Sequence, residues 1–168
     1  AELGVPAEAA REGLAKARPA KMRLNLHDFA GVQVLDDAYN ANPDSMLAAL
    51  ETLNDLPCAG RRVAVLGYMA ELGPHAETAH AEVGRAAARL GVQHLFAVGR
   101  HAESMAAAAT GASPIIARSF ATAAEAARAA LESVRPGDLV LVKASRSTRL
   151  EQVVDLLRTE LPIRTLTC

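Results

Sequence analysis

Short runs of apolar, often β-branched residues alternate along the chain with longer stretches in which alanine and leucine recur at helical spacing. This alternation is typical of βαβ units built around a mostly parallel sheet. Most of the runs are apolar at nearly every position, which indicates strands that are buried on both faces. The sequence therefore predicts an α/β fold, a Rossmann-like open, mostly parallel sheet with helices on both faces. The expected strands are residues 32–35, 62–66, 94–98, 114–117 and 139–142.

Helical periodicity fills two of the intervals between these strands. Residues 46–53 carry one apolar stripe, and Asn42 can cap this helix with Pro43 in its first turn. Residues 79–90 carry the next stripe, and Gly91 follows as a C-terminal stop. Both segments therefore predict helices that pack one apolar face against the sheet.

Two further helices are expected over residues 124–134 and 150–157, where apolar residues again recur at intervals of three and four. The spacing of a capping box marks the start of each helix, with Thr122 and Glu125 at the first and Thr148 and Glu151 at the second.

The first 20 residues differ from this alternating pattern. A small amphipathic helix is expected from about Pro6 to Ala17, before a proline-containing break. We interpret residues 1–20 as the tail of a preceding domain plus a hinge, and residues 21–168 as the domain itself. An N-terminal helix of the same domain explains the composition equally well. Because the chain begins with alanine, we expect it to be a piece of a longer protein.

Composition and charge argue against several classes of function. A length of 168 residues suits one domain. The net charge of -1 provides no overall field for nucleic acid or for an anionic membrane surface. Cys58 and Cys168 have neither metal-site nor disulfide-framework spacing. No apolar run approaches the roughly 20 residues of a membrane span, and no signal-peptide layout is present. A soluble, cytoplasmic protein is expected.

Ligands of open parallel sheets bind beyond the carboxyl ends of the strands, and the first polar loop at such a position is residues 36–45. Carboxylates at a strand end can accept hydrogen bonds from ribose hydroxyls, and amide side chains can pair with a base edge. In the alternative interpretation, Asn42 and Ser45 only cap a helix while Asp36 and Asp37 lie in solvent. The spacing alone fits both.

The second loop, residues 67–75, has two glycines on either side of Glu71, which permits tight turning close to a ligand or partner domain. Glu71 could position a cation or an amine, although a single carboxylate is more often solvated surface. His75 and His80 are five residues apart and so miss the spacing of helical zinc ligands. Both are expected to be ordinary hydrogen-bonding histidines.

The third loop, residues 143–149, lies between a buried strand and a helix start. Cationic side chains, hydroxyls and free backbone N–H groups meet there, which favours an anion pocket for a carboxylate or a phosphate. The alternative is a capped helix with solvated charges. Neither a GxxxxGK[ST] loop nor a GxGxxG fingerprint occurs, so the chain is not expected to turn over ATP alone.

Several segments form, in order, a recognisable series. Residues 36–46 read DDAYNANPDSM, which resembles a signature of the Mur ligase family, and in particular of its MurF-type members. Residues 65–73 read VLGYMAELG and are similar to the family's VLGDMxELG stretch, and His80 follows in a similar place. The segments LFAVG at 95–99 and LVKASRS at 141–147 complete the series.

The resemblance covers Arg23 to about Leu157, and residues 1–14 are similar to the end of the family's central ATPase domain. It implies a three-domain cytoplasmic ligase whose central domain carries the P-loop and the Mg²⁺ ligands, and whose C-terminal domain closes the site. Such ligases activate a carboxylate of UDP-N-acetylmuramoyl-tripeptide with ATP as an acyl phosphate. The amine of D-Ala-D-Ala then forms an amide, giving a peptidoglycan precursor needed for cell shape and division.

The resemblance also implies two groups of binding residues. Those expected to contact ATP are Arg23, Asp37 and Asn42, and those expected to line the dipeptide pocket are Lys143, Ser145 and Arg146. Further candidates are Tyr39, Asn40, Glu71 and His80. No catalytic residue and no metal ligand is assigned within the chain, which is expected to be inactive and without a tightly bound cofactor when alone. One alternative is a free-standing nucleotide- or anion-binding module without catalysis, and another is a purely structural α/β domain that mediates assembly.

The chain departs from the family pattern at Tyr68, where the triplet usually reads Gly-Asp-Met. If the aspartate of the family contacts a cation or the attacking amine, this chain must do without that contact or use Glu71 for it. Tyr68 could instead pack at an interdomain cleft. A milder departure is Lys21-Met22 before Arg23, where a Gly-Arg pair is more usual.

Overall fold

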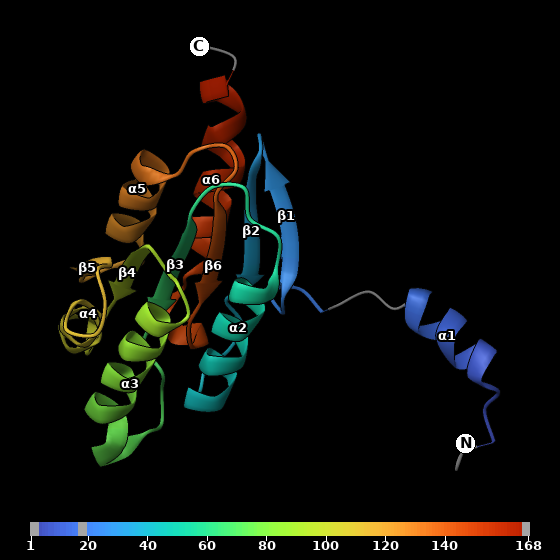
Figure 1. The fold of residues 1–168 in the computed structure, drawn as a ribbon, viewed down its shortest axis with the longest axis horizontal. Helices are drawn as coiled ribbons and strands as arrows, with labels where there is room; N and C mark the ends of the chain where they lie inside the picture. The colour runs from blue at the N-terminus through green and yellow to red at the C-terminus, as the bar shows by residue number, and fades with distance from the viewer. Residues whose placement is uncertain (1–3, 17–19, 166–168) are drawn as a thin grey trace.

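The computed structural model describes residues 4–16 and 20–165 of the chain, so part of the expected hinge and Cys168 lie outside the described residues. Within these ranges six strands form one sheet in the order β1-β2-β6-β3-β4-β5 (Figure 1). Every neighbouring pair is parallel except β1 and β2. The strands are β1 (Asn25–Phe29), β2 (Val32–Asp37), β3 (Arg62–Gly67), β4 (His94–Val98), β5 (Ile116–Phe120) and β6 (Leu139–Lys143).

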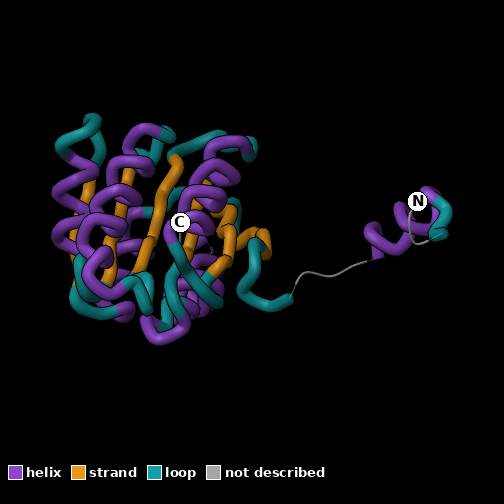
Figure 2. The backbone as a smooth tube through the Cα atoms, turned by 90° about the horizontal axis from the view of Figure 1, so that it is seen from below, coloured by secondary structure: helices purple, strands orange, loops and turns teal. Residues whose placement is uncertain are grey.

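Helices cover both faces of this sheet, as expected (Figure 2). One buried cluster joins the sheet to α2 (Pro43–Asp55), α3 (Ala76–Arg89) and α4 (Ala102–Thr110). A second cluster joins the opposite face to α5 (Ala123–Ser133) and α6 (Glu151–Thr165). Both clusters consist mainly of alanine, valine and leucine, whose small and branched side chains allow close packing of helix on sheet. The α/β prediction is therefore confirmed.

The N-terminal helix, α1 (Ala7–Lys16), forms where a helix was expected and lies apart from the sheet in Figure 1. Its described side chains are exposed. None of the helices in the described residues is both long enough and apolar enough to cross a membrane.

Two elements were not predicted, and one strand begins later than expected. The strand β1 is an edge strand of mixed polarity, and Ala30 and Gly31 turn it into β2 with positive φ angles of 53° and 83°. A positive φ at both residues suits a tight two-residue hairpin turn. The helix α4 was missed. The strand β5 begins at Ile116 instead of residue 114, at the other edge of the sheet, where several of its side chains are exposed.

Two of the helix starts form as the sequence predicts. The side chain of Asn42 accepts from Ser45 N, the Asn42 backbone N–H donates to Ser45 Oγ, and Pro43 is the first residue of α2. Thr122 and Glu125 form a capping box at α5. The box expected from Thr148 and Glu151 is wrong: Thr148 ends a short 3-10 turn, Arg149 has a φ of 55°, and α6 begins only at Glu151.

The contact between α3 and α4 depends on Gly84. A Cβ atom at this position would overlap the carbonyl oxygen of Met105, a backbone atom in α4 that cannot move alone. Gly84→Ala is therefore expected to lower the free energy of unfolding by about 3 kcal/mol, despite the better helix propensity of alanine. Urea unfolding followed by circular dichroism measures the change. Gly13→Ala in α1, where a Cβ meets nothing within 4 Å, is the control, and equal unfolding midpoints for the two variants would contradict the prediction.

Candidate functional site

The three polar loops singled out above meet at one edge of the sheet. Each follows a strand, and β2, β6 and β3 are parallel neighbours, so their carboxyl ends lie side by side. Asp37 at the end of β2 is in register with Lys143 at the end of β6, and Lys143 is in register with Leu66 of β3. Residues about a hundred positions apart in the chain therefore form one candidate site.

An ion pair joins the first and third loops. The Nζ atom of Lys143 lies 2.6 Å from Oδ2 of Asp37 and also donates to the carbonyl oxygen of Asn40 at 2.9 Å. The other oxygen of Asp37 accepts from the backbone N–H of Leu24 at 3.2 Å. The side chain of Lys143 is only 3% exposed. The positive charge of Lys143 is thus paired within the domain. Asp37, which is expected to contact ATP, therefore contacts Lys143, which is expected to line the dipeptide pocket.

Asp36 has a different environment from Asp37 because successive strand residues point to opposite faces. Asp36 is buried, and its Oδ1 accepts from the backbone N–H of Ala38 at 3.2 Å. Burial raises the pKa of this carboxyl, and the hydrogen bond from Ala38 and the nearby His27 partly oppose the rise. The alternative in which both aspartates lie in solvent is wrong, although Asn42 and Ser45 do cap a helix.

A pocket of about 420 Å³, which we call the strand-end pocket, lies beside this ion pair. The guanidinium of Arg23 lies 4.6 Å from the centre of the Tyr39 ring, forming a flat cationic and aromatic surface. The side-chain oxygen of Asn42 is occupied by the helix cap, which leaves its NH₂ group to donate. The pocket contains all three residues expected to contact ATP. Its lining residues are Arg23, Leu24, Asp37, Tyr39, Asn40, Asn42, Ser45 and Lys143.

An adjoining pocket of about 460 Å³ shares Arg23 and Tyr39 with the strand-end pocket and adds Lys21, Met22 and Arg146. The side chain of Arg146 is 60% exposed, with Nη1 at 3.1 Å from Oε1 of Glu151. The same nitrogen lies 3.4 Å from the sulfur of Met22. Because three cationic side chains line this opening, it suits a phosphate or a carboxylate.

Ser145 connects the loops from a buried position between them. It is 3% exposed, and its Oγ accepts from the backbone N–H of Ala70 at 2.9 Å and donates to the carbonyl oxygen of Ala41 at 3.3 Å. Its backbone N–H donates to the carbonyl oxygen of Tyr68 at 3.0 Å. The contact of Ser145 with a dipeptide stays a prediction.

The remaining candidates of the second loop occupy different depths. Glu71 is exposed at the loop tip, where its φ of 64° is left-handed. His80 is fully buried in α3 behind the loop, and Tyr68 is half-buried between the loop and the next strand end. Glu71 and part of Tyr68 are therefore open to a ligand in solution, whereas His80 contacts the loop from inside.

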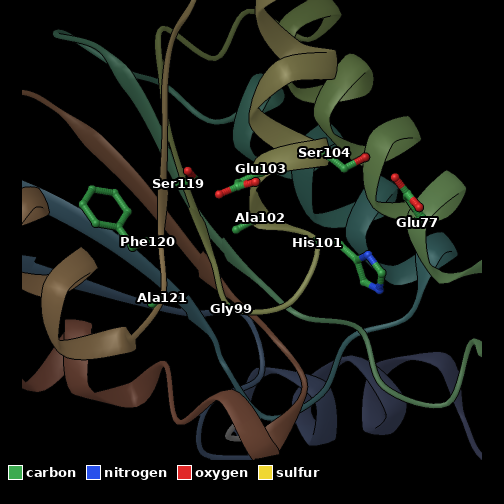
Figure 3. A pocket seen from close by; sticks show the side chains of 9 residues that line it. All are labelled: Glu77, Gly99, His101, Ala102, Glu103, Ser104, Ser119, Phe120 and Ala121. Atoms are coloured by element: carbon green, nitrogen blue, oxygen red, sulfur yellow. The ribbon is translucent and has the colours of Figure 1, made fainter.

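Two openings at the ends of β4 and β5 were missed by sequence reasoning. Figure 3 looks into one of about 480 Å³, with Glu103 turned toward Ser119 and His101 on the side of Glu77. The other, of about 390 Å³, is lined by Tyr68, Arg100 and Arg149 among others. The sequence feature that could have indicated these openings is Gly99, which directly follows the expected strand 94–98. Across the described ranges, no group of three or more His, Cys, Asp or Glu residues could hold a metal ion.

The fold and the site together define an α/β binding domain whose strand-end pockets suit a nucleotide and an anion, and whose sequence lacks a phosphate-binding glycine loop. A family model described as "Mur ligase, glutamate ligase domain" matches residues 22–146, and the chain belongs to this family. The resemblance stated from the sequence is therefore confirmed.

Relatives and solved structures point to the same branch of the family. The UDP-N-acetylmuramoyl-tripeptide–D-alanyl-D-alanine ligase of Mycobacterium leprae is 39% identical over 174 residues, covering 93% of this chain and 34% of that protein. A crystal structure of MurF from Acinetobacter baumannii is 36% identical with a TM-score of 0.82, covering 94% and 35% of the two chains. MurF from Thermotoga maritima in complex with ADP is 30% identical with a TM-score of 0.76, covering 90% and 34%. The chain spans about a third of the length of these relatives.

Proposed function

We propose that this chain is the C-terminal domain of an ATP-dependent ligase that adds D-Ala-D-Ala to UDP-N-acetylmuramoyl-tripeptide in peptidoglycan precursor synthesis. Residues 21–168 form the domain, and residues 1–20 are the tail of a central ATPase domain plus a hinge. The observation that carries the proposal is the convergence of three polar loops at one sheet edge, in a chain similar to a third of each MurF relative. The full-length ligase is proposed to work in the cytoplasm, as the resemblance to the Mur ligases implies.

The strand-end pocket supplies contacts suited to a nucleoside. The stacked Arg23 and Tyr39 offer a flat surface for a base, and Asp37 retains lone pairs that can accept from ribose hydroxyls. Asn42 can donate an amide hydrogen. The relative from Thermotoga maritima was solved with ADP, which supports a nucleotide here. The P-loop and the Mg²⁺ ligands are proposed to lie in the central domain, as the resemblance to the Mur ligases implies.

The cationic opening around Arg146 is proposed to hold the carboxylate of the incoming dipeptide. Arg146 is the exposed cation of the third loop, whereas Lys143 contributes by orienting Asp37 and the Asn40 carbonyl. The domain therefore binds and orients two substrates and excludes water when it closes, while acyl-phosphate chemistry takes place against the central domain.

Arg146→Ala in the full-length ligase is expected to lower kcat/KM for D-Ala-D-Ala by more than about tenfold, because it removes a charged contact of about 1.5–3 kcal/mol. Steady-state phosphate release with the dipeptide varied measures this. Arg128→Ala, an exposed arginine of α5, is the matched control and is expected to behave as wild type. Equal kinetics for both variants would remove Arg146 from the site.

Calorimetry on the isolated chain tests the proposal against the alternative. A domain separated from its partners is expected to bind ATP and D-Ala-D-Ala feebly or not at all, because each ligand loses most of its contacts. Tight binding of ATP by the chain alone would instead favour a free-standing nucleotide-binding module. Ligase activity of the full-length protein with the three substrates is the decisive measurement.

A further inference from the structure

We propose that His80 is a positioning residue of the ligase: from inside α3 it holds the loop of Tyr68 to Ala70 against Ser145, and so sets the geometry of the candidate site without contacting a ligand. The functional part of this inference rests on the proposed function. The structural part, the hold on the loop, does not.

The imidazole of His80 makes two hydrogen bonds with backbone groups. Its Nε2 accepts from the backbone N–H of Met69 at 2.9 Å, and Nδ1 lies 2.6 Å from the carbonyl oxygen of Ala76. A backbone N–H can only donate and a carbonyl oxygen can only accept. The proton must therefore be on Nδ1 and the lone pair on Nε2, so that only the neutral ring, in one tautomer, satisfies both neighbours. His80 is 0% exposed, so both bonds are shielded from bulk solvent.

Three consecutive residues of the loop are held from two sides. The carbonyl oxygen of Tyr68 accepts from Ser145 N, Met69 N–H donates to His80, and Ala70 N–H donates to Ser145 Oγ. Ser145 Oγ in turn donates to the carbonyl oxygen of Ala41, in the loop that carries Asn40 and Asn42. A continuous series of hydrogen bonds thus runs from α3 through the second and third loops to the first. His80 is its anchor in the core.

The ring of His80 also orients an aromatic neighbour. Its centre lies 5.4 Å from that of Tyr68 with the planes 12° apart, and 5.0 Å from that of His101. Among the described residues, these two rings are the titratable groups that face His80, one from the loop after β3 and one from the start of α4. Because Tyr68 stands where the family pattern has aspartate, this stack is a feature of the present chain, and it shapes the opening that Tyr68 lines.

The hold on the loop requires an uncharged His80. A proton on Nε2 would face the Met69 N–H, donor against donor, and break the bond. Burial lowers the pKa of His80, and the neighbouring His101 lowers it further, against an opposing hydrogen bond to Ala76. The neutral form therefore persists at neutral pH, and the loop is released only as pH falls below the usual range of histidine.

Two substitutions separate the hydrogen bond from simple packing. His80→Phe keeps a planar ring against Tyr68 but removes the acceptor, whereas His80→Gln keeps an acceptor oxygen near the position of Nε2. In the full-length ligase, His80→Phe is expected to lower kcat/KM for the dipeptide by about tenfold or more, and His80→Gln by less than about threefold. Glu82→Gln, at an exposed residue of the same helix, is expected to match wild type. Equal losses for the Phe and Gln variants, or none for Phe, would overturn the role.

Nuclear magnetic resonance on this chain tests the same inference without ligase activity. At neutral pH, the ¹⁵N signals of His80 should show a protonated Nδ1 and an unprotonated Nε2, and the opposite tautomer would overturn the inference even if no variant folded. In His80→Phe, hydrogen exchange of the Met69 amide should accelerate by at least about tenfold while the amides of β6 keep their protection. Unchanged exchange at Met69 would also overturn it. An inactive wild-type ligase with these signals intact would count against the proposed function alone.

Discussion

Asp37→Ala is expected to lower the free energy of unfolding by about 3–5 kcal/mol, because Lys143 would remain buried without a counter-ion. The ammonium group lies 2.6 Å from Asp37 and, within the described residues, also donates to the carbonyl oxygen of Asn40. Urea unfolding followed by far-UV circular dichroism measures the loss, since the chain contains no tryptophan. A loss of turnover in the Asp37→Ala ligase would therefore have two causes, the missing nucleotide contact and the lower stability of the domain.

A second substitution separates these two effects. Replacing Lys143 by methionine as well removes the unpaired charge while keeping an unbranched side chain, so Asp37→Ala with Lys143→Met should recover at least about half of the lost stability. Turnover that remains low in the stable double variant would assign a direct contact to the Asp37–Lys143 pair. An Asp37→Ala variant as stable as wild type would show that Lys143 is not held as described.

Asp138→Ala, at the amino end of β6 and so at the opposite end of the strands, is expected to lower the free energy of unfolding by a similar amount, about 3–5 kcal/mol. The carboxylate is 2% exposed and accepts from the backbone N–H groups of Arg61 and Arg135, each at 2.9 Å. The guanidinium of Arg61 lies 2.6 Å from it. One substitution thus leaves two backbone donors and a cation without their partner. Asp55→Ala, at the exposed end of α2, is the control and should change stability by less than about 0.5 kcal/mol.

The same residue makes stability depend on pH. Burial opposes the charge of Asp138, but the hydrogen bonds from Arg61 and Arg135 outweigh it and lower the pKa of the carboxyl. A carboxyl with a lowered folded-state pKa stabilises the fold fully above its unfolded value of about 3.9, and the contribution is lost as pH falls through the folded value. The urea midpoint of wild type should therefore drop more steeply below about pH 4 than that of Asp138→Ala. Parallel curves would contradict this origin.

The hydrophobic pattern of the sequence predicted best the strands that are buried on both faces. In β3, β4 and β6 nearly every side chain is buried, so the apolar run in the sequence coincides with the strand. The strand β1 lies at the edge of the sheet and has a partner on one side only. Its sequence, NLHDF, shows neither a continuous apolar run nor a strict alternation of polar and apolar residues. The helix α4 contains four consecutive alanines, Ala106–Ala109, which give no contrast between a buried and an exposed face.

The polar loops of the candidate site were visible in the sequence, but the contacts between them were not. Asp37 and Lys143 pair because β6 lies directly beside β2, although 106 positions separate the two residues. The alternation of strands and helices does not specify this strand order. The same holds for Ser145 and Ala41. Sequence spacing therefore indicates which loops are polar, and strand order decides which of their charges remain available to a ligand.

The position of β6 has a consequence for how the protein is made. Of the six described strands β6 is the last in the chain and therefore leaves the ribosome after the other five, yet it lies between β2 and β3, which do not pair with each other. Until Leu139 to Lys143 emerge, the native pairings open to the nascent chain are the hairpin of β1 with β2 and a separate ladder of β3, β4 and β5. Each part then presents a bare apolar edge, the kind of surface that invites aggregation. Insertion of β6 closes both edges and brings Lys143 to Asp37, so a product of stalled translation would lack the assembled site and be open to chaperones and proteases.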